Sequence, residues 1–310
     1  MKKEEIRKKR HEESDLKKAV GMELREHKSS FVVFNVLRAL VIVSLVRQCF
    51  LNNYESVFLC ALTLALLYVP SWAQVRFKIE LPPKLEITML CFIFAAEILG
   101  ELNRFYIVIP FWDSILHTLN GFLCAAIGFS LVVLLNDKDD LQFQLSPFFM
   151  ALVAFCFSMT IGVLWEFFEF FMDQTFHTDM QKDTVIHAIY SVALDKTRTN
   201  TPVAVTDITG TFVNGQDLGI DGYLDIGLID TMKDLFVNFL GAVFFSVTCY
   251  FYARSEGKRD SGVMGFVPEK KAADRDFLKL AQQEDDGGEQ RSASAGRRDM
   301  ERTRKNDRET

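Results

Sequence analysis

Residues 147–172 read PFFMALVAFCFSMTIGVLWEFFEFFM, and this stretch decides the fold class. It is longer than the about 20 apolar residues that a helix needs to cross a bilayer core roughly 30 Å thick. Its only charged residues are Glu166 and Glu169, close to its end. Because lipid offers no partner for free backbone N–H and C=O groups, a spanning segment of this kind must be helical. The stretch therefore predicts a transmembrane helix with two carboxylates near one end.

Five further blocks of the chain have the same apolar character. The residues are 49% hydrophobic and 25% charged, and the charges gather mainly at the two ends of the chain. Soluble cores rarely contain so many uninterrupted apolar runs. We therefore expect an all-α fold, a polytopic membrane bundle of about six transmembrane helices. The expected spans are residues 31–50, 56–75, 85–109, 111–135, 147–172 and 230–252.

These spans divide the chain into three parts. A charged segment, 1–30, precedes the transmembrane domain, 31–252, in which the connection 173–229 is an unusually long loop. The tail, 253–310, is charged, and beyond about residue 281 it has the mixed charge and low apolar content of disordered chain. We expect the tail to be largely disordered. The segment 1–30 is either a solvated orientation signal or a charged helix on the membrane surface.

Several function classes are disfavoured by composition. The net charge of −6 indicates no nucleic-acid partner. The first thirty residues are highly charged and show no cleavable signal peptide. The six cysteines lie in or beside the expected spans without a Cys-x-x-Cys spacing, so we interpret them as small apolar residues. Nothing in the sequence indicates an oligomeric state.

The distribution of Lys and Arg predicts the orientation, because positive residues near spans stay on the cytoplasmic side. Segment 1–30 holds ten of them, the tail from 254 holds fourteen, and the connection 76–84 holds three. With six spans these regions fall on one side. The loop 173–229, with eight Asp and three Lys or Arg, falls on the other. We therefore expect a protein of the cell (cytoplasmic) membrane with both termini in the cytoplasm.

Polar residues inside the spans form stripes along single helix faces. Ionisable side chains are costly in a membrane and usually mark function. In the fourth span, Asp113 and His117 are one helical turn apart, and Asn120 follows on the same face. The other stripes are Glu97, Glu101 and Arg104 in the third span, Glu166, Glu169 and Asp173 in the fifth, and Asp230, Asp234 and Asn238 in the sixth.

The stripes are expected at one depth, since the fourth and sixth spans begin outside and the third and fifth end outside. Asp113 and His117, for example, differ in depth by only about 6 Å at 1.5 Å per residue. Each residue alone has a structural alternative. Asp113 or Asp230 could be a helix cap, and Glu101 with Arg104 an ion pair. Together the stripes favour one polar pocket in the outer half of the membrane.

The order of these residues resembles the VanZ-like family of bacterial integral membrane proteins, and within it the YjdF-like branch of uncharacterised inner-membrane proteins. The family pattern is Asp-x-x-x-His opening one helix, Glu near the end of the next, and Asp-x-x-x-Asn-x-x-Gly-Ala opening the one after. The resemblance covers about residues 85–252. The matching positions are Asp113 and His117, then Glu166, then Asp234, Asn238, Gly241 and Ala242.

The chain also departs from that family. VanZ-like proteins usually carry an Arg shortly before the third motif, where this chain has Asp225, Asp230 and Lys233. The loop 173–229 is longer than in compact members, and its segments at 207–211 and 217–222 have the composition of turns or a short hairpin. The resemblance implies a role in the cell envelope, through the family's association with reduced sensitivity to a glycopeptide antibiotic. It names a site without naming a reaction.

The donor atoms suit a divalent metal as cofactor. Oxygen-rich sites favour Mg, Mn or Ca, and a His among carboxylates also permits Zn. His117, oriented by Asp113, could instead be a general base. The candidate catalytic residues are Asp113, His117, Glu166 and Asp234. The candidate metal ligands are Asp113, His117, Glu166, Glu169, Asp230 and Asp234, and the other pocket-lining candidates are Glu97, Glu101, Arg104, Asn120, Asp173 and Asn238.

Three functions are compatible with this pocket. The first is a metal-dependent enzyme that acts on an envelope lipid or lipid-linked substrate, with membrane lipids as its partners. Acyl-enzyme chemistry is disfavoured because no Gly-x-Ser-x-Gly motif is present. The alternatives are a non-enzymatic envelope binding or scaffold protein and an ion-coupled carrier, in which carboxylates at one depth relay protons.

Overall fold

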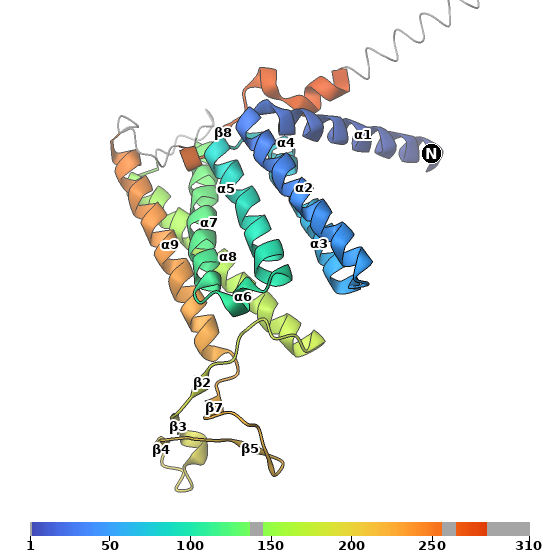
Figure 1. Ribbon diagram of the computed structural model, residues 1–310. Coiled ribbons are helices and arrows are strands. Elements are labelled where there is room, and N and C mark those ends of the chain that lie inside the picture. Colours follow the sequence, from blue (N-terminus) through green and yellow to red (C-terminus); the bar gives the residue numbers. More distant parts are fainter. Residues whose placement is uncertain (1, 137–144, 256–264, 284–310) are drawn as a thin grey trace, which may run out of the picture. The chain divides into compact units, whose positions relative to one another are not determined.

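The computed structural model describes residues 2–136, 145–255 and 265–283 (Figure 1). The chain forms two compact units. The first comprises the described residues of Met1–Pro110, Phe129–Leu145 and Ser255–Thr310, and the second those of Phe111–Gly128 and Ser146–Arg254.

Within the described residues, five helical segments are long and apolar enough to cross a membrane. The predicted all-α, polytopic membrane fold is thereby confirmed. The segments are Lys28–Phe50 (α2), Tyr54–Phe77 (α3, Tyr54–Leu66, with α4, Val69–Phe77), Trp112–Val133 (within α7, Trp112–Asn136), Pro147–Phe176 (α8) and Leu228–Arg254 (α9).

The third expected span, 85–109, is not one regular helix. It begins as α5, Pro83–Phe94, and continues as a π-helix, η1, Ala95–Leu102. A turn and the short helix α6, Phe105–Val108, complete it. The hydrogen-bond pattern thus changes partway along the block, and a sixth membrane crossing stays a prediction.

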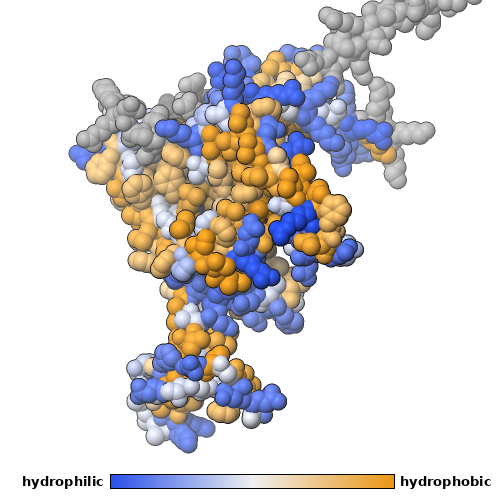
Figure 2. Space-filling view, viewed as in Figure 1, coloured by the Kyte–Doolittle hydropathy of each residue, from blue (hydrophilic) through white to orange (hydrophobic). Residues whose placement is uncertain are grey.

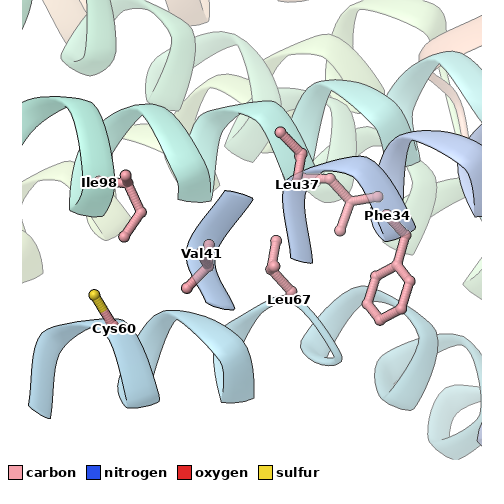
Figure 3. Packing of buried hydrophobic residues seen from close by; sticks show 7 residues of the cluster. Phe34, Leu37, Val41, Cys60, Leu67 and Ile98 are labelled. Atoms are coloured by element: carbon pink, nitrogen blue, oxygen red, sulfur yellow. The ribbon is translucent and has the colours of Figure 1, made fainter. Parts of the chain in front are cut away.

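Packing of apolar side chains between α2, α3, α5 and η1 forms the core of the first unit (Figure 3). Phe34, Leu37 and Val41 recur along one face of α2 at three- and four-residue spacing, as a helix with one buried stripe requires. They meet Cys60 of α3 and Ile98 of η1. Cys60 is fully buried among apolar residues, which agrees with its interpretation as a small apolar residue.

The N-terminal segment is a helix, α1, Lys2–Glu26, and part of the C-terminal tail folds against it. The tail forms β8, Glu269–Lys270, which pairs antiparallel with β1, Ile79–Glu80. It continues through η4, Ala273–Arg275, into helical residues 277–283. Ala281 packs with Ala19 of α1 and Val75 of α4.

Opposite charges reinforce this contact between the tail and α1. Lys271 donates to the carboxylate of Glu23, and both side chains are buried. A second ion pair joins the tail to the end of α4, where the ammonium of Lys78 lies 3.1 Å from Asp276 of the tail. The three lysine- and arginine-rich regions predicted to share one side therefore meet in the first unit. Residues 265–283 of the tail are folded; the disorder predicted for the tail, chiefly beyond about residue 281, stays a prediction, because 256–264 and 284–310 lie outside the described residues.

The second unit is built on α7, α8 and α9, which approach closely at glycines. A Cβ on Gly241 of α9 would lie 2.0 Å from the carbonyl oxygen of Thr118, and one on Gly121 of α7 would lie 2.1 Å from that of Asn238. The Ser158 hydroxyl of α8 donates to the Gly121 carbonyl at 2.7 Å. Small residues at helix crossings allow such close backbones in membrane proteins.

A lobe of short strands connects α8 to α9 (Figure 1). It spans 177–227, slightly less than the predicted loop 173–229, because α8 extends to Phe176. The segments 207–211 and 217–222 were expected to form turns or a short hairpin. A hairpin lies between them, with Asn214 and Gly215 at positive φ in its turn. The paired strands are β2 (Val185–Ile186) with β7 (Tyr223–Leu224), β3 (Ile189–Ser191) with β4 (Val203–Val205), and β5 (Phe212–Val213) with β6 (Gln216–Asp217); the 3-10 helix η2 is Val192–Leu194.

Hydrophobic residues cover much of the helical surface in Figure 2, whereas the lobe carries a mixture of apolar and polar residues. In the second unit, Phe167 of α8 and Phe244 of α9 are 65% and 66% exposed. Large exposed apolar side chains are unusual over a whole helical surface in water. They are expected where the helices face lipid.

Candidate metal centre

Three predicted site residues converge at the end of the second unit from which the lobe extends. Asp113 and His117 lie in the first two turns of α7, and Asp234 lies in the second turn of α9. Each presents one ligand atom, and these atoms all lie within 4.8 Å of one another. The spacing of four residues places Asp113 and His117 on one face, and the glycine crossing of α7 with α9 brings Asp234 to that face.

His117 is the centre of the cluster. Its Nε2 lies 3.5 Å from Oδ1 of Asp113, and its Nδ1 lies 3.8 Å from Oε1 of Glu166 on α8. The side chains of His117 and Glu166 are only 9% and 5% exposed. The imidazole is thus held between carboxylates from two helices, one at each ring nitrogen.

Two carboxylates beside His117, those of Asp234 and Glu166, have too few hydrogen-bond donors. Oδ1 of Asp234 and both carboxylate oxygens of Glu166 are buried without a hydrogen-bond partner among the described residues. The side chains of Thr231 and Gln181 also lie beside the carboxylate of Glu166. Buried carboxylates at short separation repel one another and require a proton, a cation or a donor nearby. The cluster therefore has the electrostatics of a cation site.

A layer of amides lies beneath the cluster, deeper along the helices. Nδ2 of Asn120 donates to Oδ1 of Asn238 at 3.2 Å, linking α7 to α9. Asn238 is completely buried, and its own amide donates to the sulfur of Met159 on α8 at 3.6 Å. Gly162 of α8 leaves the space that Asn238 occupies. These contacts fix the three helices relative to one another one turn below Asp234.

Glu169 is beside the cluster with a different partner. It lies almost one helical turn beyond Glu166 and is buried. Its Oε1 accepts a hydrogen bond from Nε1 of Trp165 at 2.8 Å. Among the described residues it does not join the Asp113, His117 and Asp234 group. Its predicted metal-ligand role therefore lacks the geometry that the other three share.

The structure gives Asp230 and Asp173 a loop-anchoring role. Asp230, a predicted metal ligand, accepts a hydrogen bond from the backbone N–H of Lys182 at 2.9 Å. Asp173, predicted to line the pocket, accepts from the backbone N–H groups of Met180 and Gln181. Both carboxylates thus hold the first residues of the lobe against the ends of α8 and α9. Sequence spacing could not reveal this role, because it depends on where the lobe returns.

Glu97, Glu101 and Arg104 belong to the first unit. Glu97 and Glu101 lie on η1, and Arg104 follows it at positive φ. Their predicted place in the pocket, together with the carboxylates of α7, α8 and α9, stays a prediction.

Sequence reasoning missed four residues that support the site. Ser158 and Gly162 set the packing of α8, and Gln181 donates to the hydroxyl of Thr231 at 2.7 Å across the start of α9. In the sequence, Ser158 and Gly162 were recognisable only as small residues within a Phe-rich span, a pattern that can indicate close helix packing. Gln181 carried no signal, because its position depends on the lobe.

The donor set fits a divalent cation. Ligand–metal distances of about 2.0–2.6 Å allow ligand atoms of one ion to lie up to roughly 4–5 Å apart. The Asp113, His117 and Asp234 atoms meet this limit. Two carboxylates with one imidazole suit Zn or Mn, and three protein ligands leave positions for water or substrate. Such an incomplete shell is typical of catalytic rather than structural metal sites.

Comparison with known proteins gives a family and no nearer relative. Residues 31–255 match the model of a family described as "Predicted membrane protein (DUF2238)". No curated protein and no solved structure matches the chain. The matched region contains α7, α8 and α9 in full, and hence every residue of the cluster.

Proposed function

The chain belongs to the DUF2238 family of predicted membrane proteins, and from this premise we propose that its function lies within the membrane. In this proposal Asp113, His117 and Asp234 hold a divalent cation, and the resulting centre is the active site of an enzyme. The substrate is an envelope lipid or a lipid-linked molecule. The protein resides in the cell (cytoplasmic) membrane, with both termini in the cytoplasm and the centre near the outer face.

One observation carries the proposal: the ligand atoms of Asp113, His117 and Asp234 lie within 4.8 Å of one another. Residues from two helices, separated by more than a hundred positions, meet there; His117 and Asp234 are buried and Asp113 is partly exposed. A bound cation would relieve the repulsion between the carboxylates of Asp113 and Asp234, and Oδ1 of Asp234 is buried without a hydrogen-bond partner among the described residues.

A bound cation of this kind polarises a phosphoryl or carbonyl oxygen and lowers the pKa of a coordinated water. The protein's own groups complete the site. Asp113 and Asp234 supply negative charge, His117 supplies a nitrogen ligand, and Asn120 with Asn238 fixes the spacing of α7 and α9.

A lipid is the favoured substrate class because of where the cluster lies. Asp113, His117 and Asp234 lie on α7 and α9, and α8 packs beside them. All three helices are long and apolar enough to cross a membrane, and α8 and α9 carry exposed Phe side chains. A headgroup at the membrane interface is within reach of residues in the first turns of α7 and α9. The likeness to VanZ-like proteins, through Asp113, His117 and Asp234, supports an envelope substrate.

A second candidate, an ion-coupled carrier, draws on the same close carboxylates. Asp113 and Asp234 could share a proton instead of a metal, since two adjacent carboxylates rarely ionise together. Metal analysis separates the two candidates.

The test begins with the full-length protein purified in detergent with its native lipids. We expect about one Zn or Mn per chain, lost in Asp113→Asn and in Asp234→Asn but retained in the exposed lobe variant Asp217→Asn. The doubly substituted Asp113→Asn, Asp234→Asn protein should be scarcely worse than either single variant, because ligands of one ion fail together.

Activity is then measured as phosphate release from a lipid pyrophosphate substrate, before and after chelation. We expect release that chelation abolishes and added metal restores. A wild-type protein without metal under all these conditions, or additive losses in the double variant, would refute the metal centre. Retained metal without release would refute a lipid pyrophosphate as the substrate and leave the metal centre in place.

A further inference from the structure

The position of Glu166 beside His117 leads to an inference that rests on the proposed metal centre. We infer that Glu166 is a positioning residue, not a metal ligand. It holds the His117 ring through Nδ1, so that Nε2 faces the metal.

The two nitrogens of His117 face different carboxylates. Nε2 lies 3.5 Å from Asp113, a member of the close group, whereas Nδ1 lies 3.8 Å from Glu166. The nitrogen beside Asp113 is the one that can share an ion with it. Nδ1 then points away from the ion and toward α8. Among the described residues, Glu166 is outside the group whose ligand atoms lie within 4.8 Å.

Metal-bound histidines ordinarily donate the other ring N–H to a carboxylate or carbonyl. That contact fixes the tautomer and raises the basicity of the ligating nitrogen. Glu166 is the carboxylate placed to accept from Nδ1. The separation of 3.8 Å is slightly beyond direct hydrogen bonding, so a direct hydrogen bond requires a small rotation of the ring.

Glu166 has two polar neighbours besides His117, the side chains of Thr231 and Gln181. Its side chain is 5% exposed, and neither carboxylate oxygen has a hydrogen-bond partner within the described residues. A carboxylate buried in this way is destabilising unless a donor meets it. Among the neighbours of Glu166, the imidazole of His117 is the group that can also become a cation, and its Nδ1 lies 3.8 Å from Oε1 of Glu166.

Glu169 supplies a matched control on the same helix. It is similarly buried, at 8% against 4% for the whole residue, and it carries the same charge. Its partner is Trp165, not His117. A general effect of removing a buried carboxylate from α8 would appear at both positions. An effect through His117 would appear only at Glu166.

The experiment titrates Co²⁺ into the metal-free full-length protein and follows both affinity and the visible absorption of the bound ion. We expect Glu166→Leu to keep one site per chain, with affinity about 10- to 100-fold weaker and an altered spectrum. Glu166→Gln, which retains an acceptor for Nδ1, should fall between Glu166→Leu and wild type. Glu169→Leu should match wild type in both readouts.

Thermal unfolding separates positioning from packing. A buried carboxylate replaced by Leu should leave the midpoint of unfolding unchanged or raised, so weaker binding cannot be attributed to misfolding. Unchanged affinity and spectrum in Glu166→Leu would overturn the inference, and so would complete loss of the ion, as in Asp113→Asn, since that would make Glu166 a ligand. Failure of the proposed function has a different signature: wild type, Asp113→Asn and His117→Ala would then all lack a Co²⁺ site.

Discussion

The close crossing of α7 and α9 makes Gly241 a sensitive position, although it touches no ligand. A Cβ on Gly241 would lie 2.0 Å from the carbonyl oxygen of Thr118 and 3.0 Å from the backbone nitrogen of Phe122. Both are backbone atoms, which cannot rotate away. The helices themselves would have to separate in Gly241→Ala.

The required separation is roughly 1.4 Å, the difference between that contact and the 3.4 Å at which ordinary van der Waals distances begin. Overpacking of this kind destabilises by about 1–3 kcal/mol. Asp234 lies two turns from Gly241 on the same helix, so it would move away from Asp113 and His117. Sites need their groups within about 0.5 Å of productive geometry. We therefore expect Gly241→Ala to weaken metal affinity at least about tenfold.

The assay is Co²⁺ titration with thermal unfolding of the same preparation. Gly210→Ala is the control, because a Cβ on that lobe glycine meets no atom within 4 Å. Gly241→Ala with the affinity and unfolding midpoint of Gly210→Ala would refute the reasoning, since the α7–α9 crossing would then be neither tight nor responsible for the position of Asp234.

Two other regions yield predictions. Burial raises the pKa of Glu23 to about 7, against the hydrogen bond and charge of Lys271; the folded protein thus binds this proton more tightly than the unfolded chain. The contribution of Glu23 to stability is present below about pH 4.5 and is lost as pH rises through 7. The midpoint of thermal unfolding should therefore fall between pH 5 and pH 8. The fall should be larger in Lys271→Met, which lacks the ammonium that favours the ionised carboxylate. Equal pH dependence of the two proteins would contradict this. Reporters should read cytoplasmic near Pro83 and external near Asn200, and the opposite reading at either position would reverse the membrane orientation.

The sequence alone was sufficient to predict the helices long and apolar enough to cross a membrane, because such a helix depends on its own residues and not on distant ones. Each span must satisfy its backbone within itself, so apolar length predicts it without knowledge of its neighbours. The common face of Asp113 and His117 follows equally from helical periodicity. The block 85–109 shows the limit of this reasoning, since apolar length did not indicate that its second half is a π-helix.

Contacts over long sequence separations were outside the reach of such reasoning. Lys271 and Glu23 are 248 residues apart, and the charge pattern placed their segments on one side without indicating that they pair. Asp230 carried the same signal as Asp234, an acidic residue at helical spacing near the start of a span. The two differ in the structure because the first residues of the lobe lie against the start of α9, where the backbone N–H of Lys182 donates to Asp230.

Helical periodicity in the sequence therefore predicts which helix faces are polar, whereas the packing of the helices selects the polar residues that meet. Spacing along one helix is set by local backbone geometry, which is the same in every helix. Convergence of Asp234 with Asp113 and His117 depends instead on how closely two helices cross. That distance is set by Gly121 and Gly241, whose missing side chains let the backbones of α7 and α9 touch.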